Sequence, residues 1–237
     1  MKVSVVIPMY NESSIIADTA KKLSEEMEKD FDSYEILFSD DGSKDGCTDM
    51  VRALELPCVR VTGYEQNQGK GCAVRTAVME AEGDIIMFTD ADLAYGTKVI
   101  SEAVKALEAD KDAGILIGSR NIGKDGYEGY TFLRKVASKV YIKVLCIVGG
   151  FDLTDSQCGC KAFRREAARE IFSKAKVNGF AFDFELILRA KKTGIKIIEM
   201  PVNIINHRES KIHIVRDSIR MLRDIRKIKK DIKKEDK

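Results

Sequence analysis

Two carboxylates separated by one residue follow an apolar run in the first half of this sequence. Asp90 and Asp92, on either side of Ala91, come directly after the run that ends at Thr89. Carboxylates at positions i and i+2 after a strand can reach one hard cation, and proteins hold Mg²⁺ through one or two carboxylates together with phosphate oxygens and water. The tripeptide therefore predicts a site for Mg²⁺ or Mn²⁺ beside a diphosphate, with an ordinary acidic turn as the alternative.

A second acidic turn, Asp40-Asp41-Gly42-Ser43, follows the second apolar run. A carboxylate at the end of a strand can accept hydrogen bonds from a ribose hydroxyl or a base N–H in doubly wound folds. Ser43 or Asp45 can equally cap the next helix, so a purely structural turn remains open.

Gly69-Lys70-Gly71 is similar to a phosphate-binding loop but departs from its pattern. The spacing from Gly63 is one residue too long, and Gly71 stands where Ser or Thr is required. A Gly-Lys-Gly helix start can still present N–H groups and one positive charge to a phosphate, with a simple turn as the alternative. The sequence contains no GxGxxG, which argues against a nicotinamide dehydrogenase.

The segments around these turns predict an α/β fold. Short β-branched runs alternate with helical patterns, as in βαβ units of a mostly parallel sheet, whose ligands bind beyond the carboxyl ends of the strands. The predicted strands are Val3–Pro8, Tyr34–Ser39, Cys58–Thr62, Asp84–Thr89, Gly114–Gly118 and Ile195–Met200. The predicted helices are Asn11–Lys29, Gly46–Leu54, Gly69–Ala81, Thr97–Ala109, Phe132–Val148, Arg164–Ser173 and Phe182–Lys192.

Charge is distributed unevenly along the chain. The formal net charge is +2, but residues 207–237 hold 12 Lys and Arg against 6 Asp and Glu. We therefore divide the chain into a domain of residues 1–206 and a basic C-terminal helix or tail of residues 207–237. The tail has a helical apolar line of Ile212, Val215, Ile219, Leu222, Ile225 and Ile228.

The sequence bears on location as well. It has no run long enough to span a membrane and no export signal, and its six cysteines predict reduced thiols in the cytoplasm. Phe132–Val148 has a broad apolar face, which is typical both of a core helix and of an interfacial one. Together with the basic tail it favours peripheral association with a membrane surface, and we expect no nucleic-acid partner.

Taken together, the segments resemble the family-2 glycosyltransferases of the GT-A fold, a Rossmann-like sheet flanked by helices. The matching segments are Val5–Glu12, Asp40–Gly46, Asn67–Gly71 and Gly83–Asp92, in family order. The second half is similar to the polyisoprenyl-phosphate glycosyltransferases, and nearest to the dolichyl-phosphate β-glucosyltransferase pattern. These further segments are Gly118–Arg120, Asp155–Arg164, Phe180–Leu186, Glu199–Val202 and Ser210-Lys211.

The resemblance implies a role for each matching residue. The nucleotide and its cofactor would be bound by Pro8, Tyr10, Glu12, Asp40, Asp41, Lys70, Asp90 and Ala91. Asp90 and Asp92 would hold Mg²⁺ or Mn²⁺. The acceptor and the phosphates would contact Arg120, Arg134, Gln157, Lys161 and Lys211. Asp92, Arg120 and Asp183 would take part in catalysis.

The same resemblance implies an inverting transfer of a hexose from a nucleotide diphosphate sugar to a polyisoprenyl phosphate such as dolichyl or undecaprenyl phosphate. Ala94 replaces a glutamine that mannosyl enzymes often carry, which favours UDP-glucose over GDP-mannose. Cys160 replaces an aromatic residue, and residues 203–206 lack an expected tryptophan, which leaves the acceptor open.

Two other functions remain open from the sequence. A phosphate acceptor is already an anion and needs no strong general base, so Asp183 would then be structural or positioning. If the acceptor is a saccharide or protein hydroxyl, Asp183 becomes the candidate base. The third possibility is a catalytically silent module that binds nucleotide sugars.

Overall fold

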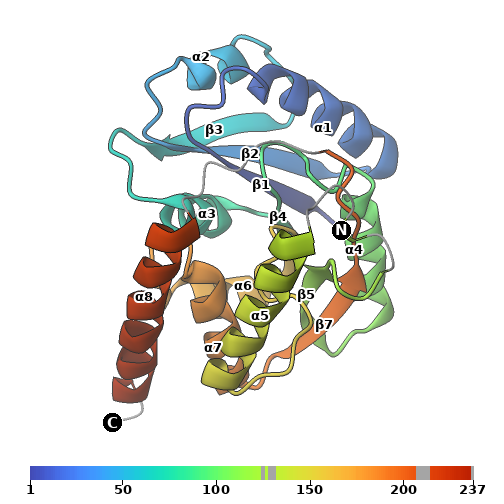
Figure 1. Cartoon of the computed structure of the whole chain (residues 1–237). Coiled ribbons are helices and arrows are strands. Elements are labelled where there is room, and N and C mark those ends of the chain that lie inside the picture. The colour runs from blue at the N-terminus through green and yellow to red at the C-terminus, as the bar shows by residue number, and fades with distance from the viewer. Residues whose placement is uncertain (124–125, 128–131, 207–213, 236–237) are drawn as a thin grey trace.

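The computed structural model describes residues 1–123, 126–127, 132–206 and 214–235. Of residues 133, 134 and 214–223 it describes the backbone but not the side chains. Within these residues, seven strands form one sheet in the order β3-β2-β1-β4-β6-β5-β7 (Figure 1). The strands are β1 (Val3–Met9), β2 (Tyr34–Asp41), β3 (Val59–Tyr64), β4 (Ile85–Phe88), β5 (Ala113–Ser119), β6 (Lys161–Arg164) and β7 (Lys196–Pro201). The α/β architecture predicted from the sequence is confirmed.

Eight helices accompany the sheet in the described part of the chain. They are α1 (Ile16–Asp30), α2 (Cys47–Arg52), α3 (Lys70–Glu80), α4 (Val99–Ala109), α5 (Phe132–Gly149), α6 (Arg165–Phe172), α7 (Phe182–Thr193) and α8 (Ile214–Lys234). In Figure 1, α1 and α2 lie on one side of the β3-β2-β1 part of the sheet and α3 lies on the other. Because helices cover both faces, β1 and β4 are apolar almost throughout and fully or nearly fully buried.

Sequence patterns missed one strand. β6 lies antiparallel between β4 and β5, whereas the β1–β2, β1–β4, β2–β3 and β5–β7 pairs are parallel. Its four residues, Lys161–Arg164, begin and end with a basic residue and carry no clear period of two. Such a short segment gains its strand conformation from the two neighbours it joins, so local propensity does not reveal it.

The first helix begins later than its apolar pattern predicts, at Ile16 instead of Asn11. Asn11 has a φ of 51°, outside the helical region. Its backbone N–H donates to Ser43 Oγ (2.9 Å), and its side-chain oxygen accepts from the Lys44 N–H (2.9 Å). The residues before α1 are therefore used to tie the first loop to the second.

A second, smaller core lies between α5, α7 and α8. It contains Leu145, Ala181, Phe184, Leu188, Ile225 and Ile228. Arg189 and Glu185, both 3% exposed in their side chains, form an ion pair that Glu235 extends from the chain end. The described part of the predicted tail is therefore packed onto the preceding helices, with the apolar side chains of Ile225 and Ile228 facing protein.

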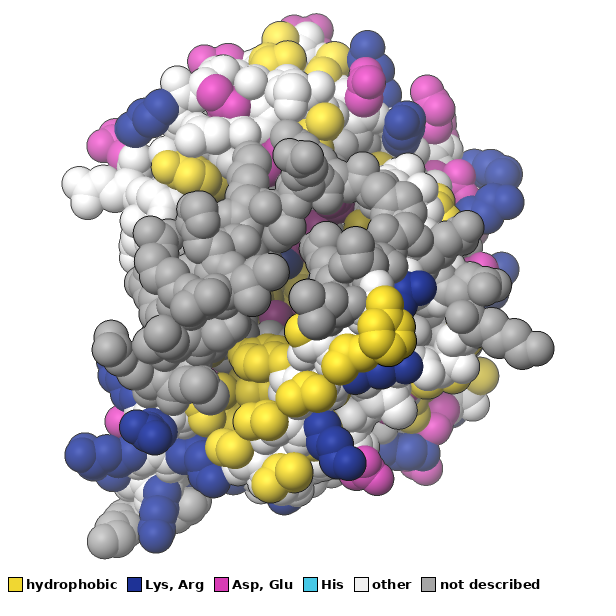
Figure 2. Space-filling model, viewed as in Figure 1, with side chains coloured by type: hydrophobic (Ala, Val, Ile, Leu, Met, Phe, Trp, Pro, Cys, Tyr) yellow, Lys and Arg dark blue, Asp and Glu magenta, His cyan; other side chains and the backbone are white. Residues whose placement is uncertain are grey.

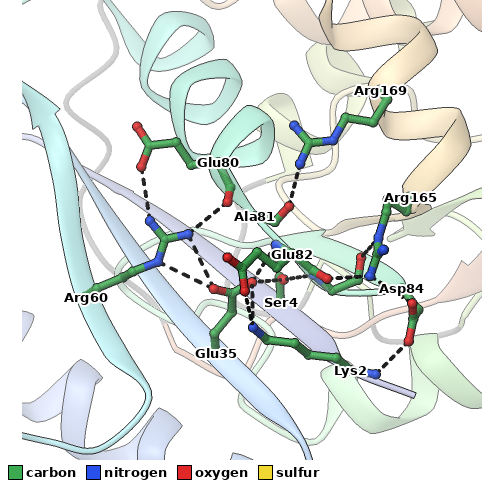
Figure 3. A network of polar contacts seen from close by, with 11 residues as sticks. Lys2, Ser4, Glu35, Arg60, Glu80, Ala81, Glu82, Asp84, Arg165 and Arg169 are labelled. Carbon is green, nitrogen blue, oxygen red and sulfur yellow. Dashed lines mark hydrogen bonds and ion pairs between the residues drawn. The ribbon is translucent and has the colours of Figure 1, made fainter.

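Charged side chains also join the elements at the amino ends of the strands (Figure 3). Glu35 at the start of β2 accepts from Ser4 Oγ (2.6 Å) and from the Glu82 N–H (2.6 Å), and it pairs with Arg60 of β3 (3.4 Å). Arg165 of α6 donates to the Gly83 carbonyl (2.9 Å) and pairs with Asp84 (2.8 Å). This network fastens α6 and the α3–β4 connection to the sheet, at the end opposite the predicted site.

Candidate active site

The Asp90-Ala91-Asp92 turn follows β4 at the carboxyl edge of the sheet, as predicted. Leu93 closes the turn with a φ of 47° and donates its N–H to the Asp90 carbonyl (3.0 Å). Thr19 of α1 donates to the Ala91 carbonyl (2.7 Å), and Asn206 donates to the Leu93 carbonyl (2.8 Å). The backbone of the turn is thus held from both sides, which fixes where the side chains of Asp90 and Asp92 begin.

Lys70, at the start of α3, forms an ion pair with Asp90 Oδ1. Burial lowers the pKa of Lys70, but Asp90, Asp183 and Asp92 outweigh that effect and raise it above the usual range of a lysine. The ammonium is therefore charged at neutral pH. On the other side, a Cβ at position 159 would lie 2.1 Å from Asp90 Oδ2, so Gly159 is what makes room for the carboxylate.

Lys161 and Asp183 form a buried ion pair below this cluster. Their Nζ and Oδ1 atoms are 2.6 Å apart, and the Lys161 side chain is 1% exposed. Lys161 also donates to the Cys158 carbonyl (2.7 Å) and lies over the Phe88 ring, 5.6 Å from its centre. With its ammonium enclosed in this way, Lys161 positions Asp183, and its predicted contact with an acceptor phosphate would require this pair to open.

The ion pair with Lys161 does not by itself set the pKa of Asp183. Burial raises the pKa of Asp183 above its usual range, although Lys161 and Lys70 act in the opposite direction. Asp183 lies in the first turn of α7, where the helix N-terminus also favours a negative charge. A cluster of three acids and two lysines, Asp92, Asp90, Lys70, Asp183 and Lys161, therefore connects the β4 turn to α7.

Asp41 has a structural task that the sequence did not indicate. Its two oxygens accept from Tyr64 Oη (2.8 Å), Asn67 Nδ2 (2.8 Å) and the backbone N–H groups of Gln68 (2.7 Å) and Gly69 (3.0 Å). These donors occupy the acceptor positions of a carboxylate. Asp41 therefore fixes the loop before α3, and its predicted contact with the nucleotide would have to displace one of these donors.

Asp40 and the first loop form the neighbouring wall. Asp40 accepts from the Ser43 N–H (3.0 Å) and from Thr48 Oγ1 (2.8 Å). Asp45 accepts from the N–H groups of Ser13 (2.8 Å) and Cys47 (3.1 Å). Burial acts to raise the pKa of Asp45, but these bonds outweigh it and lower the pKa to about 2.

The predicted nucleotide residues of the first loop lie along this wall. Pro8 is half-buried in β1, opposite Ser39 of β2, and Tyr10 is 43% exposed just after the strand. Glu12 is half-buried, and its carbonyl accepts from the N–H groups of Ile15 and Ile16 (3.0 Å each). A partly exposed tyrosine ring at the carboxyl edge of a parallel sheet is suitably placed for a nucleotide base.

The start of α3 does not provide the phosphate cradle that Gly-Lys-Gly suggested. The carbonyl of Asn178 accepts from the N–H groups of Gly71 (2.8 Å) and Cys72 (3.3 Å), and Arg75 donates to Asn178 Oδ1 (2.7 Å). The loop before α7 thus caps α3 and uses the backbone donors of its first turn. The ammonium of Lys70, by contrast, is directed toward Asp90.

Arg120, directly after β5, is held by Asp155. Its Nε and Nη2 atoms donate to the two carboxylate oxygens at 2.6 and 2.9 Å, and Asp155 is completely buried. The guanidinium also lies 5.2 Å from the centre of the Tyr127 ring. Burial lowers the pKa of Arg120, but Asp155 outweighs this and raises it well above the ordinary value.

Tyr95 connects Arg120 to the acidic turn. Burial, followed by the nearby Cys158, raises the pKa of Tyr95 well above its ordinary value, while Arg120 opposes that shift and Asp90 adds to it. Tyr95 therefore lies within electrostatic reach of both Arg120 and Asp90. Gln157, on the loop before β6, is half-buried and donates to the Ser156 carbonyl at 3.4 Å.

Two predicted phosphate ligands fall outside what the structure describes: the side chain of Arg134, in α5, and the whole of Lys211. Conversely, the sequence reading gave no role to Asp155, Gly159 or Glu199, although all three belong to the segments that carry the resemblance. The signals available in the sequence were a glycine between two cysteines, Gly159, and an acid within a predicted strand, Glu199.

Asp90 and Asp92 are the residues that fit a divalent cation. Among the residues 1–123, 126–127, 132–206 and 214–235, no group of three or more His, Cys, Asp or Glu side chains is placed to hold a metal. A pair of carboxylates is nevertheless the donor set that Mg²⁺ uses when phosphate oxygens complete its shell. The Lys70 ammonium already pairs with Asp90, so this carboxylate is placed to have a cation as its neighbour.

Comparison with known proteins places these segments in one family. Residues 4–172 match the model of glycosyl transferase family 2. The chain is 35% identical over 243 residues to a dolichyl-phosphate beta-glucosyltransferase of Dictyostelium discoideum, covering 95% of this chain and 73% of that protein. It is 30% identical to the Saccharomyces cerevisiae dolichyl-phosphate beta-glucosyltransferase, covering 94% of this chain and 72% of the other.

A third relative is considerably longer. Glycosyltransferase AglD of Haloferax volcanii is 30% identical over 226 residues, which cover 93% of this chain but 36% of AglD. Among solved structures, glucosyl-3-phosphoglycerate synthase of Mycobacterium tuberculosis in complex with phosphoglyceric acid has a TM-score of 0.74 at 18% identity, covering 96% of this chain and 79% of that one.

Mannosyl-3-phosphoglycerate synthase of Rubrobacter xylanophilus has a TM-score of 0.70 at 18% identity, covering 99% of this chain and 74% of that one. These structural likenesses bear on the fold alone, and they agree with the sheet described above. Since the family model covers most of the chain and the curated relatives match nearly all of it, the chain belongs to glycosyl transferase family 2.

Proposed function

We propose that this protein transfers a hexose, with UDP-glucose as the favoured donor, to a polyisoprenyl phosphate and inverts the anomeric carbon. The observation that carries the proposal is the cluster of Asp90, Asp92 and Lys70 at the carboxyl edge of the sheet, in a chain similar over 95% of its length to a dolichyl-phosphate beta-glucosyltransferase. Solved structures of similar fold were obtained with UDP-glucose and Mn²⁺, and with UDP and Mg²⁺.

Asp90 and Asp92 would hold Mg²⁺ or Mn²⁺, which would neutralise charge on the diphosphate as the nucleotide leaves. Lys70 supplies a second, protein-bound positive charge next to the same carboxylates. The Lys70 ammonium pairs with Asp90. When a cation binds Asp90 instead, Lys70 would turn toward the diphosphate. Tyr10 and the wall formed by Asp40 are suited to the nucleotide.

The state of Asp183 favours a phosphate acceptor over a hydroxyl. A general base needs an accessible carboxylate within reach of the proton it removes. Asp183 is 7% exposed and bonded to the buried ammonium of Lys161 at 2.6 Å. A phosphate nucleophile needs no base at neutral pH, so the buried pair can serve only to shape the site.

A lipid acceptor requires contact with a membrane surface, and α5 supports such contact. Its side chains Ile142 and Leu145 are buried, while a stripe on another face remains exposed: Phe132 (82%), Val136 (41%), Val140 (58%), Val144 (38%) and Ile147 (72%). We call this the α5 stripe. Figure 2 shows it as a continuous apolar band with lysines beside it. One face of α5 thus belongs to the core, and the other, exposed face supports the proposed interfacial role.

No helix in the described residues is both long and apolar enough to cross a membrane. The α5 stripe would therefore lie in the interface, with the exposed Lys139 and Lys143 near the headgroups. On α8 the exposed basic residues face solvent, and Lys229 ties α8 to α5 by donating to the Val148 carbonyl (2.7 Å). All six cysteines are free thiols, which supports a location on the cytoplasmic side.

The proposed chemistry is tested by incubating the purified protein with Mg²⁺ or Mn²⁺, radiolabelled UDP- and GDP-sugars and short polyprenyl phosphates. We expect metal-dependent transfer from UDP-glucose to the lipid, and its loss in the Asp90→Asn/Asp92→Asn double variant. Slow donor hydrolysis without lipid product would point to a different acceptor. Neither activity, in a folded protein that binds UDP, would support a silent nucleotide-sugar module.

Membrane contact is tested separately, by vesicle co-sedimentation of a Val140→Glu/Ile147→Glu variant. Because burying one aliphatic side chain contributes about 1.5–3 kcal/mol, we expect vesicle affinity to fall at least tenfold. Transfer to a short, water-soluble acceptor should stay close to wild type. The control is Met50→Glu, which places the same charge on an exposed methionine of α2. Equal vesicle binding by all three proteins would rule out the α5 stripe as the contact.

A further inference from the structure

Arg120 owes its position to one buried carboxylate. Asp155 accepts from Nε, from Nη2 and from the backbone N–H of Arg120, at 2.6, 2.9 and 3.2 Å. A bidentate pair of this kind fixes the plane of the guanidinium as well as its location. Any displacement of the Asp155 backbone therefore moves the guanidinium and redirects its remaining N–H groups.

The Asp155 backbone is itself held by Glu199. The Glu199 carboxylate accepts from the Thr154 N–H with both oxygens (2.9 and 3.0 Å), from Thr154 Oγ1 (2.8 Å) and from the Asp155 N–H (3.1 Å). Thr154 Oγ1 also lies 2.6 Å from Ser119 Oγ, at the end of β5. Glu199 thus closes a ring of bonds that begins and ends beside Arg120.

Glu199 provides a rigid anchor for this ring. It lies in β7, opposite Ile117 of β5, so two paired strands set its distance from Arg120. Within the described part of the chain, the Glu199 carboxylate accepts all four of its hydrogen bonds from Thr154 and Asp155 and none from a basic side chain. A carboxylate that serves only surface charge would more often face Lys or Arg, whereas this one organises a loop.

We infer that Glu199 is a positioning residue for the transfer reaction, acting on Arg120 through Thr154 and Asp155. The inference rests on the proposed function together with the role that the resemblance implies for Arg120, which we take to be binding of the acceptor phosphate. Arg120 directly follows β5, so it belongs to the β5 side of the site. Glu199 would therefore control how well that side of the site binds phosphate.

Glu199→Gln tests the inference at the level of kinetics, with Lys196→Met as the matched control on the same strand. Lys196 pairs with Asp110 on the surface and takes no part in the ring. We expect the acceptor KM of Glu199→Gln to rise roughly five- to thirtyfold, while the donor KM and the thermal midpoint stay near wild type. An unchanged acceptor KM would overturn the inference.

A double-mutant cycle with Arg120→Lys shows whether Glu199 acts by positioning Arg120 or contributes to the site independently of it. If Glu199 acts through Arg120, adding Glu199→Gln to the Arg120→Lys variant should raise the acceptor KM little further. An equal loss in both backgrounds would mean that Glu199 does not act through Arg120. Thr154→Val, which keeps the N–H bonds but removes the hydroxyl, should shift the acceptor KM in the same direction by a smaller factor.

A chemical readout makes the inference independent of activity. Phenylglyoxal reacts with accessible guanidinium groups, and peptide mass spectrometry reports the rate at each arginine. We expect Arg120 to react several-fold faster in Glu199→Gln than in wild type or Lys196→Met, with Arg60 unchanged. If this holds but the wild type transfers no sugar to polyprenyl phosphate, the proposed function fails and the role of Glu199 in orienting Arg120 stands. Unchanged Arg120 reactivity overturns the inference in either case.

Discussion

The amino and carboxyl ends of the sheet both gather charged side chains, but they treat a buried carboxylate in opposite ways. At the amino end, Glu35 is 6% exposed and accepts from a hydroxyl, a backbone N–H and the guanidinium of Arg60 (Figure 3). At the carboxyl end, Asp183 is 7% exposed and accepts a hydrogen bond from the ammonium of Lys161.

The pKa values follow this difference. Burial acts to raise the pKa of Glu35, but Ser4, the Glu82 N–H, Lys2 and Arg60 outweigh it and lower the pKa below its ordinary value. Burial also dominates at Asp183, and there Lys161 and Lys70 fail to reverse it, so the pKa is raised. At the amino end several partners stabilise the charged carboxylate of Glu35 and join elements of the fold, whereas at the carboxyl end burial outweighs the lysines around Asp183.

The largest expected effect comes from breaking the buried pair at the carboxyl end. Lys161→Met leaves Asp183 as an uncompensated buried charge, and we expect a loss of about 3–5 kcal/mol in the free energy of unfolding, measured with urea. Lys161→Met/Asp183→Leu removes both charges and should recover most of that loss. A single variant within about 1 kcal/mol of wild type would show that solvent already reaches the pair.

Replacing a glycine by alanine at each end of the sheet adds one methyl group there and sharpens the comparison. A Cβ at Gly83 would lie 2.5 Å from the Ser4 backbone nitrogen and 2.7 Å from the Ile85 carbonyl oxygen, atoms that cannot easily move. Gly83→Ala should therefore destabilise the fold by about 1–3 kcal/mol. We expect activity per folded molecule to remain normal.

Gly159→Ala should behave in the opposite way. Its Cβ would meet Asp90 Oδ2, the end of a side chain that can turn aside. We expect a loss of metal-dependent activity of tenfold or more, with less change in urea stability than for Gly83→Ala. If Gly159→Ala keeps full activity at low metal concentration, Asp90 is not a ligand.

A smaller effect is expected from Glu35→Gln, which keeps the shape but removes the charge. We expect a loss of about 1–2 kcal/mol near neutral pH and no change in kcat. Because the folded pKa of Glu35 lies below its ordinary value of 4.5, the advantage of wild type over Glu35→Gln is complete above that pH. It should fall as the pH drops through the lower folded value, and urea titrations across this range check the sign. An advantage that grows on acidification would contradict the assignment.

Much of this organisation could be predicted from local pattern. Alternating apolar runs and helices predicted the βα units, and the predicted strand ends at Pro8, Ser39 and Thr89 lie within two residues of the observed ones, so the polar residues after them were placed at one edge of the sheet. The Asp90–Asp92 spacing gave the candidate cation pair, and the segments in family order led to glycosyl transferase family 2, which the comparisons confirm. These features depend on residues that are close in sequence, where periodicity and turn chemistry are informative.

What the tertiary structure decided was which partner each charged or apolar side chain meets. Lys161 reaches Asp183 across 22 positions, Arg120 reaches Asp155 across 35, and Glu199 reaches Asp155 across 44. The same applies to β6, which is a strand because β4 and β5 lie on either side of it, and to Ile225 and Ile228, which face α5 and α7. Burial selects these partners, since a charge or an apolar surface leaves water only where the whole fold supplies a matching group, and no local pattern records that match.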